Sequence, residues 1–279
     1  MTFSFANAAP LTLRETLCCG QAFRWVENAD GSFTGVVEGC LATVRHAADT
    51  LDVEVSASSR DAAPCQAGFW ENYFALDIDY AALHRAYSRN ATLAKCVAFA
   101  PGIRVLRQDF FETLVSFIIS QNNNIPRIKG IVERLCDNFG EPLGAGPDGK
   151  TRHAFPSPAF LASLDLADLA CLRAGYRDKG ILDAARRVAD GRLDPLALRG
   201  LETSAAREAV LGVYGAGPKV ADCVLLFGLG RFEAFPVDVW IRRAMASLFP
   251  RGLPKCARAT AGIAQQYIFN YARQRRSCE

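Results

Sequence analysis

Short runs that alternate hydrophobic and polar residues dominate the first part of the chain. Three such runs follow one another, FTGVVEG (residues 33–39), CLATVRH (40–46) and TLDVEVS (50–56), with turn residues at Gly31, Gly39 and Asp49–Thr50. This alternation is typical of strands with one buried face. The pattern therefore predicts an antiparallel meander.

The remainder of the chain has helical spacing. Two short helices are expected between Tyr80 and Val97, and from Asp109 onward apolar residues recur every three or four positions. The segment 141–158 is rich in Gly and Pro and is predicted to be a surface connection. One helix face carries Ile125, Ile128, Ile131, Val132, Leu135 and Phe139.

These patterns predict an α+β protein with two parts: an N-terminal antiparallel β domain with short helices at residues 1–99, and a mainly helical domain at residues 100–279. With 279 residues, 50% of them hydrophobic, the chain can bury one sizeable core or two smaller ones. The net charge is +3, but residues 239–279 carry eight Lys and Arg against one Glu, so the first 238 residues sum to −4. The basic C-terminal part could contact phosphates, or be an ordinary solvated helix end.

The ten cysteines are scattered, with no CxxC pair and no cluster of four in the C-terminal part; they are Cys18, Cys19, Cys40, Cys65, Cys96, Cys136, Cys171, Cys223, Cys256 and Cys278. This spacing argues against a zinc site and against an iron–sulfur cluster, and favours reduced core residues. No N-terminal segment resembles a signal peptide, and no stretch of about 18 apolar residues could span a membrane. We expect a reducing compartment, cytoplasmic or nuclear, and no membrane partner.

The segments VYGAGPKVADC (213–223) and FPVDVW (235–240) carry the clearest chemical signal. Gly215 and Gly217 permit positive φ or close backbone approach, and Pro218 suits the first turn of a following helix. A helix, a hairpin and a second helix result. The exposed N–H groups at the helix start fit a DNA phosphate without sequence preference, although an unspecialised pair of helices could show the same glycine pattern.

Lys219 falls in the first turn of the second helix and precedes a largely apolar stretch. The helix dipole and burial both disfavour the ammonium form, so that a nucleophilic amine becomes accessible. The alternative is a lysine that extends outward to bind phosphate. Asp238 follows Pro236 and precedes a helical run, which predicts an ordinary N-cap, but a rigidly held carboxylate also suits proton relay or charge stabilisation beside the lysine.

Several stretches together resemble the helix-hairpin-helix DNA glycosylases, and within them the 8-oxoguanine DNA glycosylase/AP lyases of the eukaryotic type. They are CGQAFRW (19–25), YFALDIDY (73–80), RVLRQD (104–109), SFIISQNNNIPRIKGIVERLC (116–136), AGYRDKGILDAAR (174–186), GPKVADC (217–223), PVDV (236–239) and AQQYIF (264–269). The resemblance spans nearly the whole chain, and the order and spacing of the motifs are highly specific. It implies excision of 8-oxoguanine opposite cytosine in base excision repair.

An enzyme that acts on a base must extrude it and fill the space left behind. The resemblance assigns Tyr176 as the intercalating aromatic, and Asn122, Arg127 and Arg177 as the residues that bind the orphaned cytosine, whose acceptors suit arginine donors. Core packing is the alternative for Tyr176. Helix termination is the alternative for Asn122 to Asn124.

The resemblance also implies a base pocket. Cys223, one turn after Lys219, and Phe269 would sandwich the extruded base, Gln265 would read its Watson–Crick edge, and the carbonyl of Gly20 would accept the N7–H that only oxidised guanine has. The alternatives are plain core residues for Cys223 and Phe269, and a simple turn glycine for Gly20.

The implied mechanism is attack of the Lys219 amine on the sugar C1′, a Schiff base, and β-elimination of the 3′ phosphate by a monomer acting on double-stranded DNA. No redox cofactor is expected; family members can hold a Na+ or K+ ion at the hairpin, here through the carbonyls of Leu211, Val213 and Ala216. Trp240 is expected at the DNA backbone, where relatives usually have histidine, and Tyr214 replaces a usual proline. The resemblance therefore does not carry over the details of the phosphate contacts at these two positions.

Two other functions fit parts of the sequence. A glycosylase of the same fold could act on another lesion, such as an alkylated base, but that reading predicts a pocket without the set of Gly20, Gln265 and Phe269. A non-catalytic hairpin module could grip DNA, but it has no use for Lys219 with Asp238.

Overall fold

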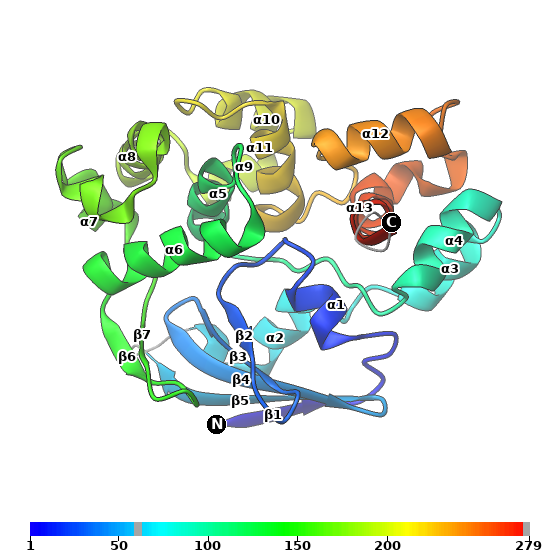
Figure 1. Ribbon diagram of the computed structural model, residues 1–279, viewed down its shortest axis with the longest axis horizontal. Coiled ribbons are helices and arrows are strands. Elements are labelled where there is room, and N and C mark those ends of the chain that lie inside the picture. The colour runs from blue at the N-terminus through cyan, green and yellow to red at the C-terminus, as the bar shows by residue number, and fades with distance from the viewer. Residues whose placement is uncertain (59–62, 276–279) are drawn as a thin grey trace.

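The computed structural model describes residues 1–58 and 63–275, which form a sheet layer below a helical layer (Figure 1). The sheet is antiparallel, with strand order β1-β5-β4-β3-β2. The three predicted runs form β3, β4 and β5, so the meander is confirmed. The strands are β1 Thr2–Phe5, β2 Trp25–Glu27, β3 Phe33–Val37, β4 Cys40–Ala47 and β5 Thr50–Ser58.

The turn between β3 and β4 is made by Glu38 (φ 42°) and Gly39 (φ 75°). Positive φ at both central residues is the geometry of the tight turn whose twist matches a two-residue hairpin. The short edge strands β1 and β2 were not predicted. β1 adds to the sheet through Thr2 opposite Glu54, a pairing that local alternation cannot reveal.

Short helices cover the sheet and bury its apolar face: α1 Leu13–Leu17, the 3-10 turn η1 Ala63–Cys65 and α2 Ala67–Tyr73. Trp25 and Trp70 lie in this core with Phe74 and Tyr73. The indole N–H of Trp25 donates to the Tyr73 hydroxyl at 2.9 Å, so the one polar group of Trp25 is satisfied inside an aromatic core.

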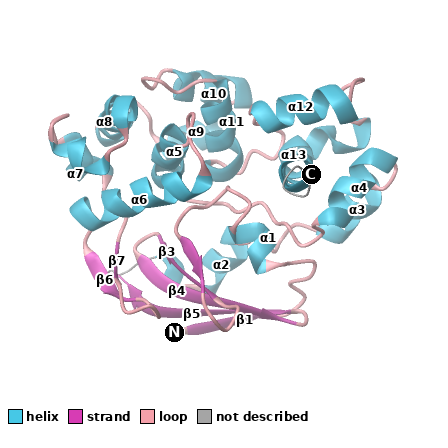
Figure 2. Cartoon of the chain, in the orientation of Figure 1, coloured by secondary structure: helices cyan, strands magenta, loops and turns pink. Residues whose placement is uncertain are grey.

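The helical layer holds a second, larger core. Figure 2 shows that helices make up nearly all of this layer. The two short helices predicted between Tyr80 and Val97 are confirmed. The second packs along the C-terminal helix, and the first contacts that helix through His84 and the Tyr267 hydroxyl, 2.8 Å apart. The elements are α3 Tyr80–Tyr87, α4 Ala91–Phe99, α5 Phe110–Ile119, α6 Ile125–Phe139, α7 Pro158–Ala162, η2 Asp168–Leu172, η3 Gly175–Arg177, α8 Asp178–Ala189, α9 Pro195–Gly200, α10 Thr203–Leu211, α11 Pro218–Cys223, the π-helical turn η4 Val224–Gly228, α12 Val239–Leu248, η5 Lys255–Thr260 and α13 Ala261–Arg275.

The segment predicted as a plain surface connection, 141–158, contains a small two-stranded sheet, so that prediction was incomplete. Strand β6 Pro142–Ala145 pairs with β7 Thr151–His153, with an irregular register between Pro142 and Gly144. Its Gly and Pro content obscured the strand pattern. The predicted face of α6 is confirmed at its centre, where Ile128, Ile131, Val132 and Leu135 are buried.

Two of the sequence motifs meet where the layers join. The Gln21 side-chain amide donates to the carbonyls of Thr16 (2.8 Å) and Arg104 (2.7 Å), and its oxygen accepts from the Leu106 N–H at 2.9 Å. The buried Arg104 guanidinium lies 4.5 Å from the centroid of the Tyr80 ring. These bonds fix the loop that contains Gly20 against the helical layer.

Nine cysteines lie within the described residues and none of them is paired there; five are buried, Cys19, Cys40, Cys96, Cys136 and Cys223. Cys278 lies outside the described residues. In the described parts of the chain no helix is both long enough and apolar enough to cross a membrane.

Candidate active site and nucleic-acid interface

The predicted helix-hairpin-helix is formed by α10 and α11. Gly215 has φ +75°, as the turn requires, whereas Gly217 is extended (φ −88°, ψ 178°) and acts as the N-cap of α11. An added Cβ would meet nothing within 4 Å at either glycine. With Pro218 at the first helical positions, the backbone at the start of α11 stays open to an anion.

Lys219 is held by a hydroxyl and a ring rather than by a carboxylate. Its Nζ donates to Ser120 Oγ at 2.8 Å and lies 4.6 Å from the centroid of the Phe117 ring. Ser120 Oγ in turn donates to the Phe117 carbonyl at 2.7 Å, so it can only accept from the lysine. Ser120 was not predicted from the sequence, because nothing local connects positions 99 residues apart.

Asp238 is the N-cap of α12, as predicted: its Oδ1 accepts from the Ile241 N–H at 2.8 Å. Lys219, Cys223 and Asp238 come together at this point of the fold. Burial raises the pKa of the Cys223 thiol to about 11; the nearby Lys219 charge opposes this, and the charge of Asp238 adds to it. The thiol is therefore neutral at neutral pH and offers an uncharged wall to the site.

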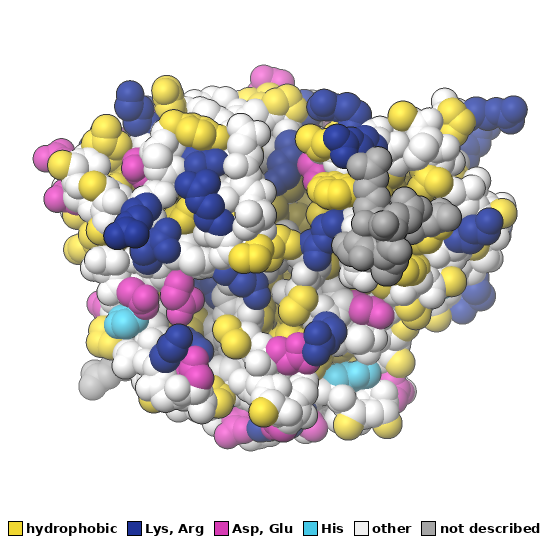
Figure 3. All heavy atoms as spheres, viewed as in Figure 1, with side chains coloured by type: hydrophobic (Ala, Val, Ile, Leu, Met, Phe, Trp, Pro, Cys, Tyr) yellow, Lys and Arg dark blue, Asp and Glu magenta, His cyan; other side chains and the backbone are white. Residues whose placement is uncertain are grey.

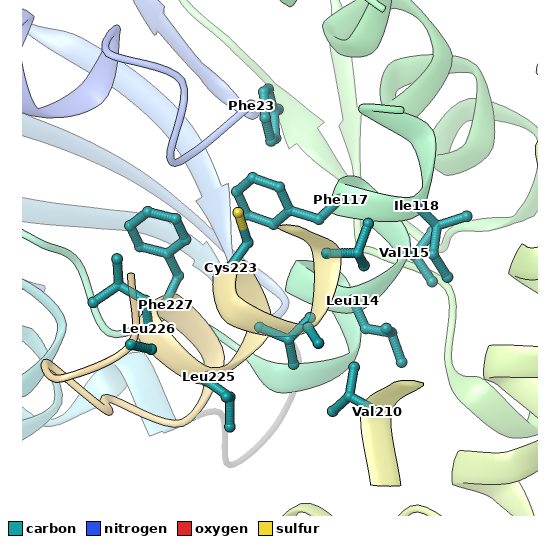
Figure 4. Close-up of a cluster of buried hydrophobic side chains, with 14 of the residues drawn as sticks. Phe23, Leu114, Val115, Phe117, Ile118, Val210, Cys223, Leu225, Leu226 and Phe227 are labelled. Carbon is teal, nitrogen blue, oxygen red and sulfur yellow. The ribbon is translucent and has the colours of Figure 1, made fainter. Parts of the chain in front are cut away.

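Aromatic rings stand behind this group of residues. Phe117 stacks on Phe227 with ring centroids 5.4 Å apart and 12° between the planes, and meets Phe23 edge-on at 5.7 Å. Figure 4 shows the Cys223 sulfur pointing toward the Phe117 ring. Cys223 is thus a core residue, as the alternative reading held, and at the same time lies beside Lys219.

The N-terminal half of α13 supplies the predicted edge-reading amide. Gln265 is buried, and its Nε2 donates to the Pro236 carbonyl at 3.0 Å. Its Oε1 accepts from Gln266 Nε2 at 2.6 Å. Pro236 lies two residues before Asp238, so these bonds tie α13 to the segment that carries the predicted catalytic carboxylate.

Phe269 lies in α13, and Gly20 lies close to Arg273 of the same helix. Phe269 is half-buried, and the Arg273 guanidinium lies 5.7 Å from its ring centroid. Gly20 has φ +99°, and a Cβ there would stand 3.0 Å from Ile125 Cδ1 and 3.8 Å from Arg273 Nη1. A side chain at position 20 would therefore meet both strain and crowding.

Of the predicted opposite-base residues, Asn122 lies in the loop between α5 and α6, and Arg127 lies in the first turn of α6. Asn122 is exposed, has φ +46°, and its Nδ2 lies 3.4 Å from the Tyr176 hydroxyl. Tyr176 is 57% exposed, so the alternative that it packs in the core is wrong. Asn124 caps α6 by accepting from the Arg127 N–H at 3.0 Å. The Arg127 side chain is exposed on the first turn of this helix.

Arg177 lies inside the protein in this structure. Its guanidinium donates to the carbonyls of Gln121, Asn122 and Ala174, and lies 4.4 Å from the centroid of the Tyr176 ring. It therefore braces both Tyr176, the predicted intercalating residue, and the loop of Asn122. Its predicted contact with cytosine stays a prediction.

The two departures from the family pattern both lie near the surface. Trp240 is half-buried in the first turn of α12, and Tyr214 is exposed next to Gly215, with its N–H donating to Asp183 Oδ2 at 2.7 Å. On the face in Figure 3, Lys and Arg side chains are concentrated over the helical layer, while Asp and Glu side chains gather toward the sheet. That distribution suits a polyanion lying along the helical layer.

These features define a helix-hairpin-helix DNA repair protein. Residues 5–114 match the family model of the 8-oxoguanine DNA glycosylase N-terminal domain, and residues 115–255 match that of the HhH-GPD superfamily base excision DNA repair proteins. The chain belongs to the 8-oxoguanine DNA glycosylase family within the HhH-GPD superfamily.

Named relatives agree with this assignment. The chain is 34% identical over 263 residues to the N-glycosylase/DNA lyase of Saccharomyces cerevisiae, covering 85% of this chain and 68% of the yeast protein. It is 33% identical over 240 residues to N-glycosylase/DNA lyase OGG1 of Arabidopsis thaliana, covering 82% of this chain and 64% of the plant protein. The chain thus spans about two thirds of the length of these curated relatives.

A solved structure covers almost the whole fold. The Clostridium acetobutylicum 8-oxoguanine glycosylase/lyase, in complex with double-stranded DNA containing cytosine opposite 8-oxoguanine, is 32% identical with a TM-score of 0.85, covering 99% of this chain and 98% of that one. The predicted α+β fold, with an N-terminal antiparallel sheet and a helical helix-hairpin-helix part, is confirmed.

Proposed function

We propose that this protein is a bifunctional DNA glycosylase and AP lyase that excises 8-oxoguanine opposite cytosine from double-stranded DNA in base excision repair, acting as a monomer in a reducing cytoplasmic or nuclear compartment. The observation that carries the proposal is the setting of Lys219: an amine in the first turn of a hairpin helix, bonded to Ser120 and, among the described residues, without a carboxylate ion pair. Family membership and the relatives' printed activities support the substrate.

The chemistry follows from that amine. Its lone pair forms a bond to C1′ while the bond from C1′ to the base breaks, and 8-oxoguanine leaves with the bonding electrons and takes up a proton. The nitrogen loses one proton, the C1′–O4′ bond breaks as the C1′=N bond forms, and O4′ takes up a proton, which gives a protonated Schiff base. Removal of a C2′ proton then expels the 3′ phosphate. Asp238, fixed as a cap, can stabilise the positive charge that develops and relay protons.

Recognition divides between two regions. Gly20, Cys223, Gln265 and Phe269 would surround the extruded base, and Tyr176 would fill the gap it leaves. On the other strand, Asn122, Arg127 and Arg177 would favour cytosine, because guanidinium groups only donate and cytosine presents acceptors.

The hairpin can accept an alkali cation without any side-chain ligand. The Leu211 carbonyl is at the C-terminal end of α10, and those of Val213 and Ala216 follow in the turn, where Val213 also accepts from the Ala216 N–H at 3.0 Å. Carbonyls at a helix C-terminus favour a cation. Bound there, Na+ or K+ would neutralise these dipoles and hold the turn in its phosphate-binding shape; the chemistry at Lys219 requires no redox cofactor and no iron–sulfur cluster.

Borohydride trapping tests the proposal. The protein is incubated with an end-labelled duplex that contains 8-oxoguanine opposite cytosine, and a stable covalent adduct is expected. Lys219→Gln, which keeps length and polarity, should bind the duplex but give no adduct and no excision. An adduct of wild-type yield in that variant would show that another amine is the nucleophile.

The same experiment separates the two other functions. A duplex with an alkylated base replaces the 8-oxoguanine duplex in a parallel reaction. Excision of the alkylated base alone would favour a glycosylase for another lesion, and binding of every duplex without any product would favour a non-catalytic module.

A further inference from the structure

Three buried side chains and one carbonyl form a row behind the base pocket. Gln265 Nε2 donates to the Pro236 carbonyl at 3.0 Å, and Gln266 Nε2 donates to Gln265 Oε1 at 2.6 Å. Gln266 Oε1 lies 3.6 Å from the sulfur of Cys19. The row joins α13 to the loop beside Gly20 and to the segment before Asp238, and all of its members are buried.

The direction of this row is fixed at one end by chemistry. A proline carbonyl can only accept, so the Gln265 atom that faces Pro236 must be its nitrogen. Its oxygen then faces Gln266, which must donate. Burial raises the pKa of the Cys19 thiol to about 11, so the thiol keeps its proton and can donate it. The two acceptors within its reach are the Gln266 oxygen and the Thr16 carbonyl, which lies 3.3 Å from the sulfur. Rotating the Gln265 amide by half a turn would place its oxygen against the Pro236 carbonyl. Rotating the Gln266 amide would place its oxygen against Gln265 Oε1.

Amide direction decides which purine edge fits. A primary amide offers one donor and one acceptor, and the two change places when it rotates by half a turn. Guanine presents an acceptor at O6 followed by a donor at N1, whereas adenine presents a donor at N6 followed by an acceptor at N1. A freely rotating Gln265 could pair with both edges, but a fixed one pairs with a single edge.

We propose that Gln266 is a positioning residue that sets base specificity, by holding the Gln265 amide in the order that fits a guanine edge and opposes an adenine edge. This inference rests on the proposed function for the identity of the base. Gln266 acts through Gln265: its own amide is occupied by Gln265 on one side and faces Cys19 on the other.

The test compares two lesions that differ only at the edge which Gln265 reads. 8-Oxoguanine and 8-oxoadenine share the N7–H and C8 carbonyl, so the proposed contact with Gly20 is the same for both. Single-turnover excision of each, placed opposite cytosine, gives a ratio of rates. Gln266→Met keeps the length and removes the donor, and the ratio should fall about fivefold because one hydrogen bond to Gln265 is lost.

Gln266→Glu adds a pH-dependent readout. A protonated glutamic acid can donate to Gln265 Oε1, whereas an ionised one sets an acceptor against it, and burial keeps such a carboxyl protonated at mildly acidic pH. The ratio for Gln266→Glu should be near that of wild type at about pH 5.5 and about tenfold lower at about pH 8. The ratios of excision rates for wild type and Gln266→Met should be the same at both pH values.

A matched control lies two turns along the same helix. Gln274 Nε2 donates to Asn270 Oδ1 at 2.8 Å, and its side chain is exposed. Gln274→Met therefore removes a bond from an exposed amide to the buried Asn270, in which neither Gln265 nor Gln266 takes part, and its ratio should equal that of wild type.

The outcomes separate the two proposals. Wild-type protein that excises 8-oxoguanine, together with an unchanged ratio in Gln266→Met and a pH-independent ratio in Gln266→Glu, overturns the inference about Gln266 alone. Wild-type protein that excises no 8-oxoguanine overturns the proposed function and this inference with it. If Gln266→Met does not fold, the pH series of Gln266→Glu decides, because it compares one protein with itself.

Discussion

Glu112 lies in the first turn of α5, where the sheet layer meets the helical layer, and the pKa of its carboxyl is strongly raised. Its Oε2 lies 3.8 Å from Arg24 Nη1, and both side chains are largely buried. That Arg24 nitrogen has no hydrogen-bond partner among the described residues. Burial raises the pKa of Glu112 from 4.5 to about 7; Arg24 opposes this, while Asp109 and Glu38 add to it.

The raised pKa makes stability depend on pH. Because the folded state holds its proton more tightly than the unfolded state, the stabilisation is fully present below about pH 4.5 and is lost as the pH rises through about 7. At about 1.4 kcal/mol for each tenfold change in proton affinity, the loss amounts to about 3 kcal/mol. Glu112→Gln cannot ionise, so its stability relative to wild type should rise from no difference at about pH 4.5 to about 3 kcal/mol at about pH 8.

Urea unfolding of both proteins across this pH range measures the difference directly, since contributions from other groups largely cancel. Glu133→Gln, at an exposed position on α6, is the control and should show no such trend. A difference between Glu112→Gln and wild type that stays constant with pH would refute the reasoning. It would mean that Arg24 compensates the buried carboxylate fully.

Three further predictions concern the chemistry. Asp238→Asn should keep the bond from the Ile241 N–H and remain folded, yet slow single-turnover excision about a hundredfold or more; a rate within twofold of wild type would reduce Asp238 to a cap. Ser120→Ala removes the acceptor that holds Lys219 and should lower the excision rate about tenfold with unchanged DNA affinity, while Ser120→Thr restores it; a loss of affinity instead would point to a structural defect. Arg127→Ala should flatten the preference for cytosine, about tenfold in wild type, in excision measured opposite each of the four bases; equal wild-type rates opposite all four would contradict the cytosine-reading role.

Local chemistry made part of this structure predictable. Asp238 caps α12 because its short side chain can accept from a free backbone N–H in the first helical turn, and Gly215 adopts positive φ because the hairpin needs it. The strands β3 to β5 follow from alternation and from turn residues such as Gly39. In each case the signal and the structure it specifies lie within a few residues.

Contacts between segments far apart in the chain could not be predicted from the sequence. Ser120 holds Lys219 across 99 residues. Strand β1 is only four residues long, and its partner β5 lies far along the chain, with Thr2 opposite Glu54. Gln266 is adjacent to Gln265, a predicted pocket residue. The effect proposed for Gln266 depends on the bond from Gln265 to the Pro236 carbonyl, which lies on another segment. The family resemblance supplied the pocket residues without the bonds that orient them.

Arg177 and Arg127 should contribute unequally to the proposed reading of the opposite base. A guanidinium has five N–H donors, and in this structure Arg177 Nε, both N–H groups of Nη2 and one of Nη1 are directed at the carbonyls of Gln121, Asn122 and Ala174. A single N–H remains for a ligand, so a bidentate contact with cytosine would require one of these internal bonds to break. Arg127 lies exposed on the first turn of α6, so it can meet the base at a lower cost. The preference for cytosine should therefore depend more on Arg127, and Arg177 should act mainly by holding the loop of Asn122 in place.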